Sequence, residues 1–351
     1  MPEQLTNAIL NLNNGNLDLR EYARTKLEGD NIGNLLFPNI KTDDLKIEYI
    51  IGGNKLPVTA EVYAPDTNTK LSGRNGFAKN ILDMLLVKDS KFISEDEIVK
   101  LQNPRTTAEE QAVLNKIFND VDLTIDSVYK RINMMRFEIL QTGKLTLDEN
   151  GVTGVIDYHM PETHQETLKT SARWSEATAD PLNNLDAWVD KIVEDTGVNP
   201  SRMLMDKATS RLLLNSEAVR KAIFGVNSSI VPSMQNLNDF LSQRDLPTVA
   251  VYNEKYRLAD GSILPLVKAN TVILMPETKL GNTYFGLTAE EVELPQVSNI
   301  DVRNKDFITS VIYRRIDPVA RITKSVARAI TSFEACNEVF VAKVKWLALI
   351  M

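Results

Sequence analysis

The feature that most constrains this chain is a long run of helical periodicity between residues 106 and 140. Apolar side chains recur there at steps of three and four, and no glycine or proline interrupts the run before Gly143. Thr106 fits the N-cap, with Glu109 in the capping-box position, and Gly143 fits the stop. One helix of about 35 residues would be a rod of roughly 50 Å. The alternative is two helices with a break between residues 120 and 124.

Composition indicates an ordinary folded protein. The 351 residues correspond to two domains or one elaborate domain, and 43% of them are apolar and 25% charged. The net charge is −7 without a basic block, which argues against a nucleic-acid-binding protein, because such proteins gain affinity by neutralising phosphates. The amino-terminal segment has no signal-peptide pattern, and the longest uncharged stretch, residues 222–238, is too polar to span a bilayer. We expect a cytosolic protein with no membrane partner.

Before the long helix, the pattern predicts an arm and then a long excursion. Residues 1–45 are rich in asparagine and interrupted by glycine, so we expect them to be ordered only against another surface. The excursion, about residues 57–87, has β-prone arms around a polar tip at 66–76. Loops of this size are usually functional or disordered. We expect it to lie over an adjacent subunit, with Lys70 and Arg74 as contact residues that meet acidic partners.

After the long helix, the pattern predicts a hairpin and then a mixed α/β region that begins near Pro181. The hairpin covers residues 145–158, with its turn at 148–151. The last six residues, from Trp346 onward, are all apolar, and we expect Trp346 and its neighbours to be buried against the subunit or another copy. The other expected elements are helices at 183–196 (with Leu185, Trp188, Ile192 and Val193 inward), 208–214, 218–224 and 234–243, and strands at 202–205, 248–252, 271–275, 283–287, 308–313, 320–330 and 339–344.

Residues able to carry chemistry are few. His159 and His164 are the only histidines, and Pro161 between them forbids the regular helix that would place two imidazoles on one face. The interpretation we favour is a polar loop leaving a strand. The single cysteine, Cys336, lies between two glutamates in a β-prone segment and is expected to be a buried structural thiol. Neither a nucleophile motif nor a phosphate-binding loop occurs, so the sequence predicts no enzyme, no metal site and no cofactor.

What the sequence offers instead is a set of features that need a partner surface: an arm, a polar-tipped excursion, a long helix and an apolar end. The short segment Tyr313-Arg314-Arg315 is the most basic spot beside an aromatic residue. Because no wider basic patch surrounds it, an inter-subunit salt bridge is its favoured use.

Several segments, in this order, resemble a known family. Residues 136–144 (RFEILQTGK) are similar to a helix ending in Leu-x-Thr-Gly-Lys, and residues 151–158 resemble the strand that follows it, with His159 where the family has glycine. Trp174-Ser175, Asp180-Pro181 and Leu185-Asp-Ala-Trp188 resemble a further stretch. Later matches are residues 251–256 with Asp260-Gly261, then Pro276, Tyr284-Phe-Gly286, and Asp317-Pro318 before the closing strands. The family is the tailed-phage major capsid proteins of the lambda head-protein type, which have the Hong Kong ninety-seven fold.

The resemblance implies an α+β fold with five parts. These are an N-arm at 1–45, an extended E-loop at 46–93, a peripheral P-domain with the spine helix at 94–185, an axial A-domain at 186–300, and P-domain closing strands at 301–351. The first 45 residues match by position only.

The resemblance also implies partners and a location. Copies of the chain would assemble as hexamers and pentamers into an icosahedral shell around double-stranded DNA, without sequence-specific binding. A separate scaffolding protein and a portal protein are the expected partners, and a decoration protein is a further partner that the resemblance allows. The expected locations are the virion and, during assembly, the host cytoplasm. Two alternatives stay open: an encapsulin-type compartment shell and, less favoured, a metal-dependent enzyme that uses His159 and His164. Autocatalytic crosslinking through Lys55, Lys70 or Lys79 and Asn337 is not expected, because no motif matches.

Overall fold

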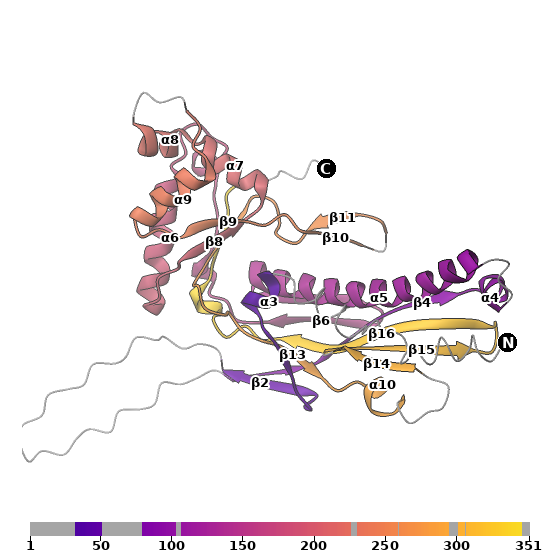
Figure 1. Ribbon diagram of the computed structural model, residues 1–351. Helices are drawn as coiled ribbons and strands as arrows, with labels where there is room; N and C mark the ends of the chain where they lie inside the picture. The colour runs from indigo at the N-terminus through magenta and orange to yellow at the C-terminus, as the bar shows by residue number, and fades with distance from the viewer. Residues whose placement is uncertain are drawn as a thin grey trace, which may run out of the picture. The chain divides into compact units, whose positions relative to one another are not determined.

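The computed structural model describes residues 32–50, 79–102, 107–225, 230–258, 260–294, 301–305 and 307–345 (Figure 1). The chain divides into two units, each built from separated stretches of sequence. Unit 1 takes residues up to 47, 81–133 and 282–332, and unit 2 takes 48–80, 134–281 and residues from 333 onward. The five-part division that follows the chain in order stays a prediction.

Unit 1 is built on a six-stranded sheet. Its strand order is β1-β13-β16-β15-β14, and β4 pairs along the other edge of β16. Its elements are α3 (Ile32–Leu36), β1 (Asn39–Lys41), β4 (Leu85–Ile93), α4 (Glu95–Gln102), the first part of α5 (Thr107–Thr142), β13 (Thr283–Gly286), α10 (Ala289–Val292), β14 (Asp301–Lys305), β15 (Ile308–Arg315) and β16 (Ala320–Thr331). Two short strands, β2 (Lys46–Ile50) and β3 (Lys79–Asp83), form a separate ribbon.

The long helix α5 is one continuous helix, so the break considered near residues 120–124 is wrong. The polar residues there fit inside the helix because neighbouring groups bind them. The Thr124 hydroxyl lies 3.0 Å from the carbonyl oxygen of Val121, and Asp120 lies 4.0 Å from the ammonium of Lys91. Gly143 ends the helix as predicted, with φ of 66°, a backbone conformation that glycine adopts easily.

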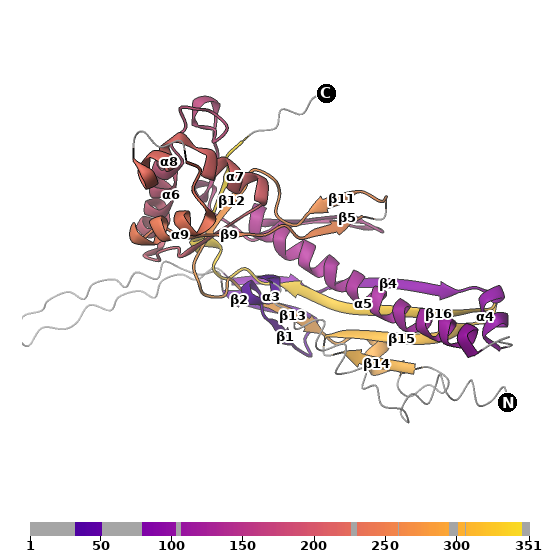
Figure 2. The same cartoon turned by 45° about the horizontal axis from the view of Figure 1, so that its top comes forward.

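Within unit 1, α5 runs along β4 and β16 (Figure 2). Ile125, Val128 and Ile132 are buried on the helix face that packs inward. A chain of buried hydroxyls crosses the same interface: Thr124 Oγ1 lies 2.7 Å from Ser325 Oγ, which lies 2.8 Å from Ser310 Oγ. These hydroxyls satisfy one another, so the helix packs on the sheet without leaving them unpaired.

Unit 2 is built on a five-stranded mixed sheet in the order β7-β17-β12-β8-β9. Every residue of the central strand β12 is buried, and helices α6 to α9 gather around this sheet in Figure 1. Its elements are β5 (Lys144–Glu149), β6 (Val152–Asp157), η2 (Glu162–His164), β7 (Gln165–Thr167), η3 (Thr170–Ala172), α6 (Pro181–Thr196), β8 (Arg202–Met205), α7 (Lys207–Asn215), α8 (Glu217–Phe224), α9 (Met234–Gln243), β9 (Thr248–Val251), β10 (Lys255–Arg257), β11 (Ile263–Pro265), β12 (Thr271–Met275), η5 (Cys336–Glu338) and β17 (Phe340–Lys343).

The helix α6 begins at Pro181, two residues earlier than predicted. Asp180 caps it by accepting hydrogen bonds from the backbone N–H groups of residues 182 and 183, and proline suits the first helical position. Three of the four residues predicted to face inward are buried, but Val193 is 38% exposed and Val189 is buried in its place. The prediction for Val193 is wrong because the buried stripe follows positions 185, 188, 189 and 192.

The predicted hairpin is present as β5 and β6, which pair in antiparallel register. Its turn residues Asn150 and Gly151 have φ of 49° and 82°. Two successive positive φ angles are the signature of the tight turn that matches the right-handed twist of a β-hairpin, which explains the Asn-Gly pair.

Candidate functional site

The three predicted contact residues, Lys70, Arg74 and Trp346, lie outside the described residues. The polar tip at 66–76 and the apolar segment from Trp346 onward lie outside them as well. Their roles stay predictions.

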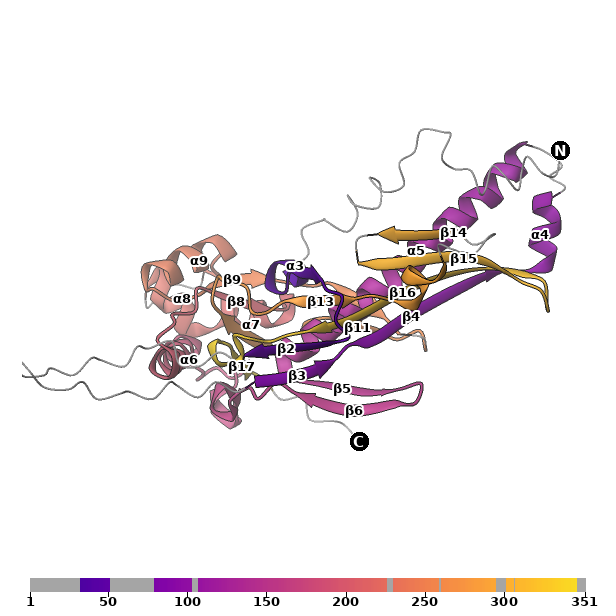
Figure 3. The same ribbon diagram turned by 90° about the horizontal axis from the view of Figure 1, so that it is seen from below.

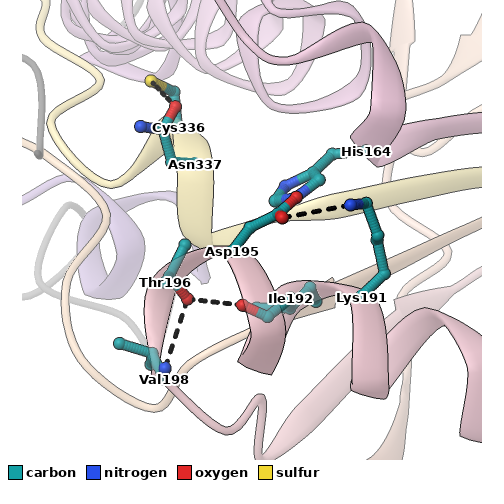
Figure 4. Close-up of polar contacts among 8 residues, drawn as sticks. All are labelled: His164, Lys191, Ile192, Asp195, Thr196, Val198, Cys336 and Asn337. Atoms are coloured by element: carbon teal, nitrogen blue, oxygen red, sulfur yellow. Dashed lines mark hydrogen bonds and ion pairs between the residues drawn. The ribbon is translucent and has the colours of Figure 1, made fainter. Parts of the chain in front are cut away.

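The two histidines have different environments. His164 is fully buried in η2, and its Nε2 lies 2.9 Å from Oδ2 of Asp195 on α6 (Figure 4). Lys191 places its ammonium 3.0 Å from the other oxygen of that carboxylate. His159 lies in the loop after β6 with φ of 57°, and its backbone N–H donates to the side chain of Asp157. Across the described ranges, no group of three or more His, Cys, Asp or Glu residues could hold a metal ion.

His164 is also part of a row of aromatic rings that sequence reasoning did not find. The ring centroids of Trp174 and Trp188 lie 6.0 Å apart, those of Trp188 and Phe340 5.6 Å, and those of Phe340 and His164 6.0 Å. Nδ1 of His164 is buried and has no hydrogen-bond partner in the described part of the chain, so we place the ring proton on Nε2. The row joins α6 to β17, and His164 is one of its packing residues.

Cys336 is buried, as expected, but it lies in the short helix η5 and not in a strand. Burial raises the pKa of its thiol to about 12, and the charge of Glu338 adds to this. A thiol with such a pKa stays protonated at neutral pH, and the thiolate is the form that acts as a nucleophile.

Asp195→Ala is expected to lower the free energy of unfolding by about 1–3 kcal/mol, because it leaves the buried His164 N–H without its acceptor. Lys191 and then His164 lower the pKa of Asp195 by hydrogen bonding to its carboxylate. The ionised carboxylate of Asp195 therefore stabilises the folded protein at pH values above the ordinary pKa of an aspartate. This stabilisation is lost as the pH falls through the lowered pKa of the folded state. The difference in the free energy of unfolding between the variant and the wild type should therefore become smaller at acidic pH. Denaturant unfolding at several pH values measures this difference.

The matched control is Glu217→Ala, which removes an exposed pair with Lys221 one helical turn away but leaves no buried group unpaired. This variant should change stability far less. Equal losses in the two variants would contradict the role given to His164.

An exposed apolar patch lies at one end of the unit 1 sheet. The strand register places Phe92 of β4 opposite Ile322 of β16, and Ile322 opposite Tyr313 of β15, so the three side chains share one face. Phe92 is 68% exposed, and Ile316 in the turn between β15 and β16 is 88% exposed. Val319 in the same turn is exposed too. We call these residues, Phe92, Tyr313, Ile316, Val319 and Ile322, the tip patch.

Hydrogen bonds hold the turn of the tip patch in place. The backbone N–H of Val319 donates to the carboxylate of Glu95 at 2.9 Å, and Arg315 Nε donates to the carbonyl of Pro318 at 3.3 Å. The first bond ties the turn to the start of α4, which lies beside this end of the sheet in Figure 3. The exposed apolar side chains are therefore presented by a supported turn, which favours a binding role.

Among the described helices, none combines the length and the apolar character needed to cross a membrane.

Comparison with known proteins identifies the family. The sequence model of the family described as phage major capsid protein E matches residues 30–332, well over half of the chain. No curated protein is significantly similar in sequence.

Solved structures identify the fold. One similar structure is described as the capsid protein assigned to a prophage of Escherichia coli CFT073; the identity is 15%, the TM-score is 0.58, and the match covers 94% of this chain and 99% of that one. A second is a phage-related protein of Bordetella bronchiseptica RB50; the identity is 12%, the TM-score is 0.54, and the match covers 93% of this chain and 96% of that one.

These matches confirm the fold and the structural role expected from the sequence: the chain has the Hong Kong ninety-seven fold and is a structural subunit of a phage head shell. A subunit of this kind forms the shell with other copies of itself and is found in the virion. The chain therefore belongs to the phage major capsid protein E family.

Proposed function

We propose that the chain assembles as hexamers and pentamers into a closed shell around double-stranded DNA, and that the tip patch is one of the surfaces buried between copies. The observation that carries the second part is the exposure of Ile316 and Phe92, at 88% and 68%, on a turn and a strand that are otherwise well bonded. A cluster of large apolar side chains kept exposed on a folded subunit often marks a contact surface. Because every copy carries the tip patch, a shell would bury apolar surface at each of these contacts.

The charge of the chain favours DNA as packaged contents and not as a tightly bound ligand. A net charge of −7 gives no broad surface for neutralising phosphates, so a shell of these subunits would enclose DNA without holding it strongly. The encapsulin-type alternative differs in its contents. A compartment shell would carry no genome.

The proposed partners follow from the family. A separate scaffolding protein would direct assembly in the host cytoplasm, a portal protein would occupy one vertex, and a decoration protein is a further candidate for the outer surface. We also propose that the subunit has no catalytic role, which accords with the raised thiol pKa of Cys336 and the packed environment of His164.

The test of the shell function is expression of the protein with and without a candidate scaffolding protein, followed by negative-stain microscopy, sedimentation and nuclease treatment. Shells of uniform size support the function, and nuclease-protected DNA in particles from infected cells supports genome packaging over a compartment. Protein that stays monomeric under every condition, with or without the scaffold, would sink the proposal.

Ile316→Ser should lower the yield of shells several-fold and leave the melting temperature of the free subunit unchanged, because Ile316 is already exposed in the isolated chain. The matched control is Val193→Ser, an exposed apolar residue on α6 of unit 2, which should assemble normally. Sedimentation gives the yield, and calorimetry gives the melting temperature. A normal yield from the Ile316 variant would remove the tip patch from the contact surface.

Replacing residues 66–76 by a short Gly-Ser turn should leave the subunit folded and prevent stable shells, because the polar tip with Lys70 and Arg74 is proposed to lie over a neighbouring copy. A single exposed charge pair contributes about 0–1 kcal/mol, but a closed shell repeats it on every copy. Circular dichroism reports the folding and sedimentation reports the assembly. Intact shells from the shortened protein would show that the excursion is dispensable.

A further inference from the structure

Two arginines face each other at the tip end of unit 1, on the side of the sheet opposite Phe92, Tyr313 and Ile322 of the tip patch. The register pairs Arg314 of β15 with Arg321 of β16, whereas the neighbouring pair Tyr313 and Ile322 points to the other face. Arg314 is exposed and Arg321 is half-buried. The side chain of Arg321 is therefore partly removed from water beside a second positive charge.

This arrangement is unfavourable in the isolated chain. Like charges directly opposite each other on neighbouring strands are destabilising, and arginine does not escape the cost by losing its proton. Burial, and then the charge of Arg314, lower the pKa of Arg321 below its ordinary value. The direction of this shift agrees with a positive charge that is disfavoured at this position. In the described part of the chain, neither guanidinium has a carboxylate within salt-bridge distance.

Three lysines of this sheet are treated differently. Lys41 lies 2.7 Å from Glu291, Lys324 lies 2.6 Å from Glu290, and Lys91 lies 4.0 Å from Asp120. Three lysines therefore have acidic partners inside the unit, while the arginine pair has none among the described residues. Surface arginines often need no partner, but a facing pair with one half-buried member leaves a binding position for an anionic group.

A carboxylate of suitable kind lies at the same end of the unit. Helix α4 begins with three acidic residues, Glu95, Asp96 and Glu97. Glu95 accepts from the backbone of Val319, and Glu97 accepts from the backbone of Ser94. Asp96 between them is exposed and makes no hydrogen bond or ion pair within the described ranges. The tip end thus presents a basic pair and an acidic side chain that do not meet within one copy.

We propose that Arg314 and Arg321 of one copy bind the carboxylate of Asp96 of a second copy. The proposal rests on the shell function proposed above, and it assigns a polar contact to the face opposite the tip patch. A surface that carries both signs of charge is complementary to another copy of itself when the two copies meet through different patches. The planar guanidinium suits paired hydrogen bonds to a carboxylate, so the contact fixes orientation as well as adding attraction.

Charge exchange tests this contact. Arg314→Glu and Asp96→Lys should each lower the yield of shells about tenfold or more, because each places like charges across the contact. The double variant R314E/D96K should recover most of the yield, because it restores opposite charges in exchanged positions. The control is Arg211→Glu, the same charge change at an exposed position of α7, which should assemble as the wild type does. Circular dichroism of each free subunit checks folding.

The results of this experiment distinguish a failure of the proposed contact from a failure of the proposed shell function. Normal shells from R314E, or a double variant no better than the single ones, would overturn the contact while wild-type shells keep the function. No shells from the wild-type protein would overturn both.

A milder variant covers the case in which R314E does not fold. Arg314→Gln keeps the length of the side chain and removes its charge. Wild-type shells should dissociate more readily as salt is raised, because salt screens an exposed contact, and R314Q shells should respond less. An equal response to salt in the two kinds of shell would also overturn the contact.

Discussion

Ile132→Asp is expected to leave no folded subunit. Ile132 is completely buried on α5, where the helix packs on the unit 1 sheet. An aspartate there must either lose its hydration or disrupt the packing, and an unpaired buried charge costs several kcal/mol. The whole free energy of unfolding of a protein is typically about 5–15 kcal/mol, so this one change removes most of it or all of it. Circular dichroism and the soluble yield measure the result.

Two control variants separate the burial of the aspartate at position 132 from its other effects. Leu123→Asp puts the same residue at a 40% exposed position of the same helix, so it tests helix propensity and charge without burial. Ile132→Val keeps the position apolar and should cost only about 0.5–1.5 kcal/mol. If the melting temperature of I132D were close to that of L123D, the packing of α5 described above would be wrong.

Gly143→Ala has the second large expected effect, a loss of about 2–5 kcal/mol in the free energy of unfolding. Two costs add at this position. Gly143 has φ of 66°, where a residue with a Cβ loses about 1–2 kcal/mol, and the new Cβ would lie 2.5 Å from the Cβ of Met160. Because Met160 Cβ is fixed to the backbone, the clash can be relieved only by moving the chain, at about 1–3 kcal/mol. Denaturant unfolding measures the change.

The chain contains controls for each cost. Gly151→Ala has φ of 82° but no atom within 4 Å of the new Cβ, so it keeps the conformational cost and omits the clash. Gly154→Ala has open space and no positive φ, so it should be nearly neutral. The predicted order of stability loss is Gly143, then Gly151, then Gly154. If the Gly143 variant lost no more free energy of unfolding than the Gly151 variant, the end of α5 would have to accommodate the new Cβ without destabilising the protein.

Local signals made part of the fold predictable from the sequence. The apolar period of α5, its stop at Gly143 and the Asn-Gly turn of the β5–β6 hairpin all depend on residues within one turn or a few positions of each other. The start of α6 lies two residues before the predicted one, because proline fits the first position of a helix as well as the end of a loop. Val193 was misassigned because the same spacing fits two adjacent stripes, and only the packing partner decides between them.

Contacts between distant residues were not predictable in the same way. His164 and Asp195 are 31 positions apart, and their pairing depends on how η2 and α6 meet. The basic spot at Tyr313-Arg314-Arg315 was visible in the sequence, and an inter-subunit salt bridge was its favoured use. That Arg314 faces Arg321 follows only from the register of β15 and β16. The sequence could not give that register, because it depends on the length of the turn between the strands.

The last two strands of the described residues, β16 and β17, lie inside the two sheets. β16 joins β4, β13 and β15 in unit 1, and β17 lies between β7 and β12 in unit 2. A ribosome-bound chain that stops before residue 320 lacks both strands, so neither sheet can close while synthesis is under way. Nascent chains therefore cannot offer the finished surfaces by which copies recognise one another. A chain that ends before residue 320 is therefore expected to stay out of a growing shell.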